Sequence, residues 1–299
     1  MTQPASIQDL GLLARCRRFL RLPLHEKSIS LYARWRKRYP SSPFPIRLPF
    51  GAWFIARGDT VGSMLAARAF EADDRAFVAC FLQPGMTVID AGAHQGLYTL
   101  LMSKRVGARG RVYSFEPSPR ERQALRLNVR INRLHNVWIQ PFALGNEESI
   151  SDLYVVNKSE TGCNSLRPPD VSEPLSTTPV QVRTLDGWLA SERAGTIDFI
   201  KLDVEGAELS VLKGAAKFLS QHPRPLIMAE VETIRTKPWG YSPHEIIELL
   251  EALEFSWFKP AGGGRLAAFD PDRDPFVGNF IAVPAERRDA LLSQLPSSC

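Results

Sequence analysis

Three carboxylates come directly after short, apolar, strand-like runs of the sequence. Asp90, Glu116 and Asp203 each stand where such a run gives way to a loop or a helical pattern. The carboxyl ends of parallel strands meet at one edge of a sheet, and α/β proteins bind their ligands at this edge. If the three runs are parallel strands of one sheet, we therefore expect the carboxylates to share one binding edge.

Asp90 leads into a loop of small residues, Ala91–Gly96, and then into Leu97–Met102, which has helical spacing. In a strand–turn–helix unit, glycines let the backbone approach a ligand and the helix N-terminus offers free N–H groups. The loop reads D-x-G-x-x-x-G and lacks one glycine of the dinucleotide fingerprint, which disfavours a pyrophosphate. A carboxylate at the strand end instead suits a cationic group, such as the amino group of S-adenosylmethionine.

Glu116 ends the second strand-like run, where an acidic side chain is well placed to accept hydrogen bonds from two ribose hydroxyls. Each signal alone has an ordinary explanation, because glycine loops occur in many βα turns and Glu116 could be a solvated strand end. The two signals at this spacing together favour a nucleoside ligand.

Asp203, Glu205 and Glu208 place three carboxylates where a fourth strand gives way to a helix. Glu205 and Glu208 are one helical turn apart and could simply complement the dipole of the helix N-terminus. Asp203 stands at the strand end and is therefore the stronger functional candidate.

Strand and helix patterns alternate through residues 86–231, which predicts a parallel sheet with helices on both faces. Two further strands, at 255–258 and 279–283, have no helical pattern between them and would add an antiparallel edge. We therefore expect an α/β fold with a doubly wound, Rossmann-like, seven-stranded and mostly parallel sheet, preceded by an N-terminal helical extension.

The sequence divides into four expected regions. These are a basic helical extension with a Pro-rich linker at 1–45, a hairpin and helix at 46–85, the sheet domain at 86–285, and a tail at 286–299. The sheet domain contains a Ser/Thr/Pro-rich insertion at 157–179, between two strands that we expect to pair. A loop of this length in a compact domain is usually functional or disordered.

The positive charge is concentrated at the N-terminus. The chain has a formal net charge of +5, but residues 1–40 hold nine Lys/Arg against two acidic residues, so the rest of the chain carries −2. This argues against a nucleic-acid groove in the sheet domain. Residues 6–39 have helical spacing, and their basic face is either a solvated surface, an interfacial helix on an anionic membrane, or a docking segment for an acidic partner.

No run of the sequence has the 18 or so uninterrupted apolar residues needed to span a bilayer, and the N-terminus lacks a signal-peptide pattern. We expect a cytoplasmic protein. The four cysteines form no C-x-x-C pair, so the sequence predicts no zinc site.

Five motifs together resemble the FkbM family of S-adenosylmethionine-dependent class I methyltransferases. They are VIDAGAHQG (88–96), FEP (115–117), QPFALG (140–145), TLD (184–186) and IKLDVEGAE (200–208). The resemblance covers about residues 60–283, and the last motif is the most specific. It implies a seven-stranded Rossmann-like sheet and methyl transfer, usually to a hydroxyl of a sugar, a polyketide or a related secondary metabolite.

The resemblance also implies a cofactor site. Its residues are Asp90, Gly92, Ala93, His94, Gly96, Glu116, Pro117, Phe142, Ala143 and Asp203. The glycine loop would line the methionine end, Glu116 would bind the ribose, and the turn at 142–143 would lie by the adenine. Asp203 would sit beside the transferable methyl group.

The chemistry asks for positioning and for a base that takes the hydroxyl proton late. Asp203 is our first candidate for this base, and His94, which is equally well explained as a cofactor contact, is the second. We expect no metal, because no ligand set is defined by spacing, although Asp203, Glu205 and Glu230 could converge.

The main interpretation is an O-methyltransferase that uses S-adenosylmethionine and acts on a small-molecule or glycan hydroxyl. A nicotinamide-dependent oxidoreductase on the same fold is the first alternative, opposed by the missing glycine. A non-catalytic module that keeps the fold for a partner or a membrane is the second, and the intact acidic strand ends speak against it.

Overall fold

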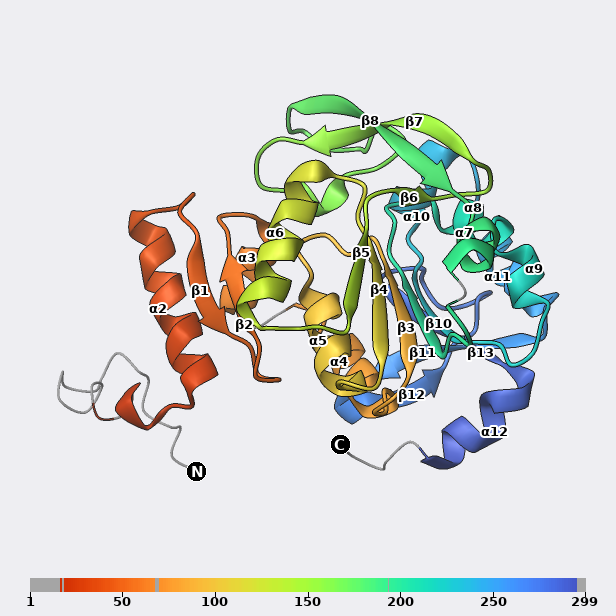
Figure 1. Cartoon of the computed structure of the whole chain (residues 1–299), viewed down its shortest axis with the longest axis horizontal. Coiled ribbons are helices and arrows are strands. Elements are labelled where there is room, and N and C mark those ends of the chain that lie inside the picture. Colours follow the sequence, from red (N-terminus) through yellow and green to blue (C-terminus); the bar gives the residue numbers. More distant parts are fainter. Residues whose placement is uncertain (1–16, 18, 68–69, 193, 295–299) are drawn as a thin grey trace. The chain divides into compact units, whose positions relative to one another are not determined.

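The computed structural model describes residues 17, 19–67, 70–192 and 194–294. The chain forms two compact units, residues 1–70 and 71–299. Residues 6–16 and 18 of the helical segment that the sequence predicts at 6–39 lie outside the described residues. The helices and strands are shown in Figure 1.

The N-terminal unit contains a hairpin flanked by two helices. Its elements are α2 (Leu24–Arg38), β1 (Phe44–Arg47), β2 (Trp53–Ala56) and α3 (Thr60–Ala67). The expected hairpin is present, since β1 and β2 pair antiparallel. The Ser28 hydroxyl of α2 accepts a hydrogen bond from the Arg47 N–H at 2.7 Å, and the buried Tyr32 donates to the Arg57 carbonyl. The helix and hairpin thus form one unit, and its boundary lies at residue 70, later than the boundary at 45 that the sequence indicates.

The C-terminal unit is organised around one large sheet. Its strands are β3 (Thr87–Ala91), β4 (Arg111–Phe115), β5 (Val137–Gln140), β9 (Phe199–Leu202), β10 (Leu226–Glu230), β11 (Phe255–Ala261), β12 (Arg265–Ala268) and β13 (Asn279–Pro284). Their order is β12-β11-β13-β10-β9-β3-β4-β5, and the run from β10 to β5 is parallel. The predicted Rossmann-like, mostly parallel sheet is confirmed.

The antiparallel edge is larger than the sequence predicts. The two expected strands are β11 and β13, and β13 lies between β10 and β11. An eighth strand, β12, pairs with β11 after the turn η4 (Gly262–Gly264). The sequence of β12, RLAA, has no alternating pattern of apolar and polar residues, because three of its four residues are exposed. The sequence therefore does not predict this strand.

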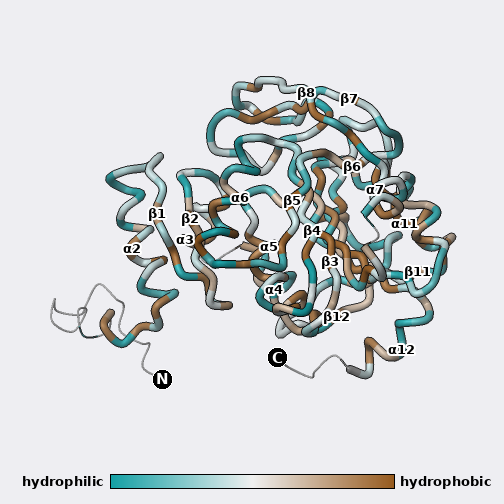
Figure 2. The backbone as a smooth tube through the Cα atoms, in the orientation of Figure 1, coloured by the Kyte–Doolittle hydropathy of each residue, from teal (hydrophilic) through white to brown (hydrophobic). Residues whose placement is uncertain are grey.

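Helices cover both faces of the sheet. They are α4 (Ala72–Phe81), α5 (Leu97–Val106), α6 (Pro119–Ile131), α7 (Leu185–Glu192), α8 (Glu208–Lys213), α9 (Ala216–Leu219), α10 (Thr233–Thr236), α11 (Pro243–Glu251) and α12 (Ala285–Gln294). The core cluster on one face draws on α7, α8, α9 and α11, while α4 and α5 pack on the opposite face. The central strands β3, β9 and β10 are largely hydrophobic because both of their faces are mostly buried, as Figure 2 shows for β3. The region 286–299, which the sequence indicates as a tail, contains most of α12, which ends at Gln294.

A second, three-stranded sheet stands beside the carboxyl edge of the large sheet. It consists of β6 (Ala143–Leu144), β8 (Leu175–Arg183) and β7 (Ser149–Val156), in that order. The predicted pairing of β7 with β8 is confirmed and is antiparallel. The insertion between them is shorter than expected because β8 already begins at Leu175, and it contains the 3-10 turn η2 (Thr161–Cys163).

Candidate active site

The carboxyl ends of four adjacent parallel strands each carry an acidic side chain. Asp90 lies near the end of β3, Glu116 directly after β4, Asp203 directly after β9 and Glu230 at the end of β10. Because the strands run in the same direction, these four carboxylates gather at one edge of the sheet, as the sequence predicts for the first three.

The glycine loop follows β3 and is held against the neighbouring strand ends. The backbone N–H groups of Gly92 and Ala93 donate to the Phe115 carbonyl at 3.1 and 2.9 Å. Gly92 has φ +79°, and a Cβ at this position would lie 1.7 Å from the Asp203 carbonyl oxygen. Only glycine therefore allows the loop to approach the end of β9 this closely.

Glu116 is buried beneath the loop. Its Oε2 accepts a hydrogen bond from the His94 N–H at 2.7 Å, and its Oε1 accepts one from the Ser118 N–H at 2.8 Å. Burial raises the pKa of Glu116 to about 8, and the neighbouring Glu121 carboxylate adds to the rise. Each carboxylate oxygen can accept a second hydrogen bond, so Glu116 retains capacity for a ligand.

Asp90 is fully buried and only half satisfied. Its Oδ2 accepts a hydrogen bond from the Thr99 hydroxyl at 2.5 Å, while its Oδ1 has no hydrogen-bond partner within the described part of the chain. Burial raises the pKa of Asp90, and the Lys201 ammonium opposes that rise. A buried acceptor without a donor costs stability and calls for an explanation, which a ligand would supply.

The remaining predicted cofactor residues lie around this loop. Gly96 has φ +92° and begins α5, and a Cβ there would meet the Leu125 side chain at 2.4 Å. The Phe142 ring is buried and packs edge-on against Phe115 at a centroid distance of 5.5 Å. Ala143 is buried at the start of β6, and Pro117 follows Glu116 in the turn before α6.

A second group of carboxylates forms where β9 and β10 end. Asp203, Glu205 and Glu230 each offer an oxygen within 4.8 Å of the others. The sequence left this convergence open, and the structure provides it. This spacing would also suit a cation, but the neighbouring Lys201 and Arg235 already supply positive charge.

Lys201 is buried in β9, and its Nζ donates to Asp203 Oδ2 at 2.5 Å. Its ammonium also lies 4.6 Å from the centre of the Tyr98 ring. Burial alone would raise the pKa of Asp203, but the Lys201 charge and hydrogen bond hold it below its usual value. Asp203 is therefore ionised at neutral pH.

Glu205 and Glu230 behave differently. Burial raises the pKa of Glu230 well above its usual value, and the Asp203 charge raises it further. Burial likewise raises the pKa of Glu205, although Arg235 opposes the rise with its Nε 3.0 Å from Glu205 Oε2. One ionised carboxylate thus stands beside two that favour the protonated form.

Glu208 has a structural role. Its Oε1 accepts hydrogen bonds from the N–H groups of Val204 and Gly206, at 2.9 and 3.2 Å, and it is the first residue of α8. These bonds fix the sharp turn after Asp203, in which Glu205 takes φ +55° and Gly206 φ +95°. The structure therefore favours the interpretation that Glu208 stabilises the N-terminus of α8.

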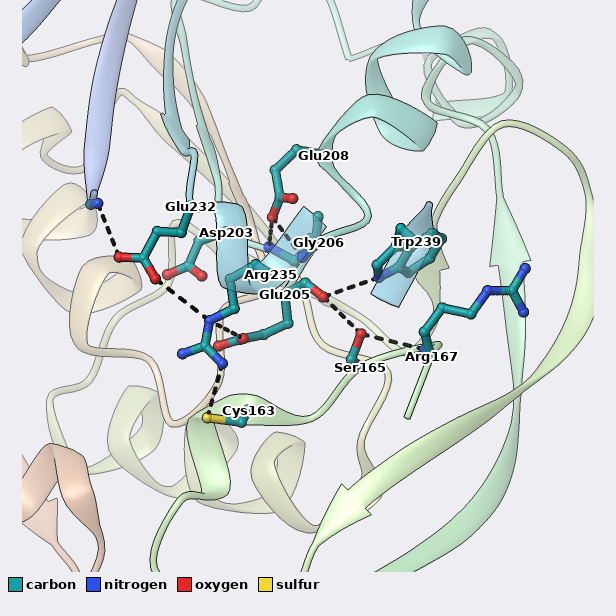
Figure 3. Close-up of polar contacts among 12 residues, drawn as sticks. Cys163, Ser165, Arg167, Asp203, Glu205, Gly206, Glu208, Glu232, Arg235 and Trp239 are labelled. Carbon is teal, nitrogen blue, oxygen red and sulfur yellow. Dashed lines mark hydrogen bonds and ion pairs between the residues drawn. The ribbon is translucent and has the colours of Figure 1, made fainter. Parts of the chain in front are cut away.

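The insertion bridges both parts of the site through the turn η2. At one end of this turn, Thr161 Oγ1 lies 3.2 Å from His94 Nε2, in the glycine loop. At the other end, Arg235 donates to Cys163 Sγ at 3.4 Å, as Figure 3 shows. The Ser165 hydroxyl then donates to the Glu205 carbonyl at 2.7 Å. The insertion is thus tied to the edge where the predicted site residues gather.

Sequence reasoning missed three side chains of this site: Lys201, Arg235 and Thr161. A lysine within the apolar run FIKL was a usable signal, because a lysine in a fully buried strand needs a partner and Asp203 follows two residues later. Thr161 and Arg235 belong to the short elements η2 and α10, whose position depends on tertiary packing, so their spacing in the sequence carries no such signal.

The parallel sheet, the glycine loop after its first strand and the acidic ends of β3 and β4 define the Rossmann-like fold of the class I methyltransferases. The chain belongs to the FkbM methyltransferase family, since the model of the methyltransferase FkbM domain matches residues 90–256. The matched segment runs from Asp90 to beyond Glu230 and so includes both parts of the site.

Three individual proteins are similar to this chain, each at low sequence identity. Methyltransferase 1 of Beauveria bassiana (strain ARSEF 2860) is 26% identical over an alignment of 147 residues, and this alignment covers 42% of this chain and 57% of the relative. The structure of methyltransferase FkbM from Methylobacillus flagellatus KT aligns with a TM-score of 0.45 at 16% identity, over 75% of this chain and 52% of that one. The O-methyltransferase from Bacillus cereus in complex with SAH aligns with a TM-score of 0.44 at 14% identity, over 75% and 88%. The chain spans just over half the length of the first two proteins.

Proposed function

We propose that this protein transfers a methyl group from S-adenosylmethionine to a hydroxyl oxygen of a sugar, a glycan or a secondary metabolite. The observation that carries the proposal is the gathering of Asp90, Glu116 and Asp203 at one sheet edge, with the first two beside a glycine loop. Membership of the FkbM family supports methyl transfer, and the acidic cluster beside the loop supports a hydroxyl acceptor.

The residues of the loop fit the proposed cofactor. Asp90 Oδ1 has no donor among the residues that the structure describes, which suits a group with N–H bonds, and the Glu116 oxygens retain capacity for the two ribose hydroxyls. The Phe142 ring and the adjacent Ala143 provide an apolar surface for the adenine. When bound, the sulfonium of S-adenosylmethionine supplies an already activated methyl group, so the protein contributes mainly alignment.

Asp203 is the proposed base for the acceptor proton. As the new O–CH₃ bond forms and the S–CH₃ bond breaks, the hydroxyl oxygen becomes a strong acid, so a carboxylate with a low pKa is basic enough to receive its proton. Lys201 keeps Asp203 ionised before this event. His94 is the alternative base, but its ring nitrogen is engaged with Thr161, which favours a role in positioning the loop.

The insertion would act as a cover over the reacting groups. Its turn η2 contacts the glycine loop through His94 and the acidic cluster through Arg235. A cover over the reacting atoms excludes water and protects the activated methyl donor from side reactions.

Equilibrium dialysis of the protein against S-adenosylmethionine and against NAD tests the cofactor. Binding of S-adenosylmethionine alone is the expected result, and tight binding of NAD alone would overturn the proposal in favour of an oxidoreductase. Turnover of a labelled methyl donor with a fractionated extract then identifies the acceptor. Binding without any turnover would favour a non-catalytic module.

Glu116→Ala is expected to weaken S-adenosylmethionine binding by on the order of 2–3 kcal/mol, because two hydrogen bonds to a charged acceptor are lost. Isothermal titration calorimetry measures the change. Glu251→Ala removes an exposed glutamate of α11 and serves as the control that should bind like the wild type. An affinity unchanged by Glu116→Ala would remove Glu116 from the cofactor site.

The same residue predicts a pH dependence of binding. Burial raises the pKa of Glu116 to about 8, so the free protein must release this proton at neutral pH before the carboxylate can accept the ribose hydroxyls. The dissociation constant should therefore fall by up to about tenfold per pH unit as pH rises toward about 8, and then level off. Glu116→Gln should show a weaker affinity that stays flat over this range, and a wild-type affinity independent of pH would contradict the assignment.

A further inference from the structure

Helix α2 of the N-terminal unit carries a row of exposed apolar side chains. Leu24, Leu31 and Trp35 are 56%, 44% and 37% exposed, and Tyr39, at the C-cap, is 43% exposed. Their spacing of seven, four and four residues places them along one stripe of the helix surface. We call these four residues the α2 stripe.

The α2 stripe borders the face by which the helix packs in its own unit, and the Trp35 ring at this border lies 5.7 Å from the Phe44 ring of β1. Ser28, Ile29 and Tyr32 are the buried residues of α2, and Ser28 and Tyr32 hydrogen-bond to the hairpin segment at Arg47 and Arg57. A surface helix of a globular protein normally has one apolar face directed at the core. Here the apolar surface extends beyond the buried residues onto the exposed part of the helix, where Leu24 and Leu31 lie.

Basic side chains border the stripe. At 100° per residue, Lys27, Arg34 and Arg38 fall within about 100° of the stripe on one side, and Arg34 and Arg38 are exposed. The Arg38 guanidinium lies over the Tyr39 ring at 5.4 Å, so charge and aromatic surface are adjacent. Glu26 is the single acidic residue of α2 against five basic ones.

We propose that the α2 stripe docks on the surface of an anionic lipid bilayer. Leucines with a tryptophan and a tyrosine, bordered by Lys/Arg, are the composition of a helix that lies in the membrane interface. The rings of Trp and Tyr favour this boundary because one part is apolar and the other polar. An acidic protein surface would satisfy the charges but would leave an aliphatic and aromatic row without a matching apolar partner.

The proposed contact is peripheral. No helix in the part of the chain that the structure describes is long and apolar enough to cross a membrane. The stripe belongs to the N-terminal unit and lies outside the segment matched by the FkbM domain. The inference therefore stands apart from the proposed methyl transfer, and either can fail without the other.

Sedimentation of the full chain with vesicles tests the proposal. Binding is expected to phosphatidylglycerol vesicles and not to phosphatidylcholine vesicles, and it should weaken as salt is raised, because the charges are screened beyond a Debye length of about 10 Å at 0.1 M. Arg34→Gln/Arg38→Gln should weaken binding by about thirtyfold. Leu24→Gln/Leu31→Gln should weaken it by at least about tenfold, since the apolar area that would be buried in the bilayer is lost.

Matched controls separate the stripe from general surface effects. Ile150→Gln changes a residue of β7 that is 76% exposed, and Arg288→Gln removes an exposed charge of α12, so neither should alter vesicle binding. All variants change exposed side chains, and their thermal melts should match the wild type.

Absent binding, equal binding to both lipids, or equal binding by the stripe variants would overturn the proposal. A wild-type dimer that the stripe variants abolish, without vesicle binding, would show that a second copy covers the stripe instead.

Discussion

Asp203→Asn is expected to lower the single-turnover rate of methyl transfer by roughly 10² to 10⁴, because the substitution keeps the shape of the side chain and removes its basicity. Cofactor affinity should change much less, since Glu116 and Asp90 belong to the other part of the site. Rapid-quench measurement with labelled S-adenosylmethionine and saturating acceptor gives the rate directly. A near-wild-type rate would end the claim that Asp203 is the base.

The pH dependence of the rate separates Asp203 from its competitors. Lys201 holds the pKa of Asp203 below its usual value, so a wild-type rate that depends on Asp203 should not change across the neutral range. A histidine base would make the rate fall below about pH 6.5, the ordinary range of imidazole, and His94→Ala would then cause the larger loss.

Glu230 is the third candidate for the base. Its pKa is raised well above the usual value by burial and by the charge of Asp203, which favours the protonated carboxyl. If Glu230 accepted the proton, the rate would rise with pH, and Glu230→Gln would slow transfer more than Asp203→Asn. The opposite order is expected, because Asp203 is the carboxylate that Lys201 keeps ionised.

The sequence predicts the framework of the site because the signals that specify it are local. Each acidic strand end directly follows its apolar run, and the glycine loop connects the first strand to its helix, so Asp90, Glu116 and Asp203 can be assigned to one sheet edge from pattern alone. Gly92 belongs to the same local loop motif, but the requirement for glycine at this position comes from tertiary packing. A side chain there would collide with the Asp203 carbonyl.

The environment of the site cannot be read from the sequence in the same way. The contacts of Thr161 with His94 and of Cys163 with Arg235 join residues 67 and 72 positions apart, and they depend on how the insertion folds back. Tertiary contacts also join the N-terminal helix to the hairpin that follows it. The prolines at 40–45 indicate a linker, yet Ser28 reaches past them to hydrogen-bond with Arg47.

Charge balance explains how the edge tolerates so many carboxylates. Burial alone would lower the pKa of Lys201, but the charges of Asp203 and Asp90 raise it above its usual value, so the ammonium and its carboxylates stabilise one another. Arg235 lies beside Glu205 and opposes the rise that burial causes in the pKa of this carboxyl. Paired buried charges contribute little net stability, whereas removal of one partner leaves the other uncompensated at a large cost.

Lys201→Met is therefore expected to destabilise the protein by about 3–5 kcal/mol at neutral pH, because Asp203 and Asp90 lose their cation while the side-chain volume is kept. Urea unfolding followed by circular dichroism measures this loss. Lys213→Met, which changes an exposed lysine of α8, should stay within about 0.5 kcal/mol of the wild type.

The destabilisation by Lys201→Met should itself depend on pH. In the wild type the folded pKa of Asp203 is depressed, so its stabilising contribution is present above the unfolded value of about 3.9 and is lost only as pH falls through the folded pKa. Without Lys201, burial raises the folded pKa of both carboxyls, which penalises their ionised forms at neutral pH and not once they are protonated. The gap between variant and wild type should therefore narrow as pH falls, and Lys201→Met/Asp203→Asn should recover part of the stability at neutral pH. A gap of constant size across pH, with no recovery in the double variant, would show that Lys201 contributes packing and not the charge that keeps Asp203 ionised.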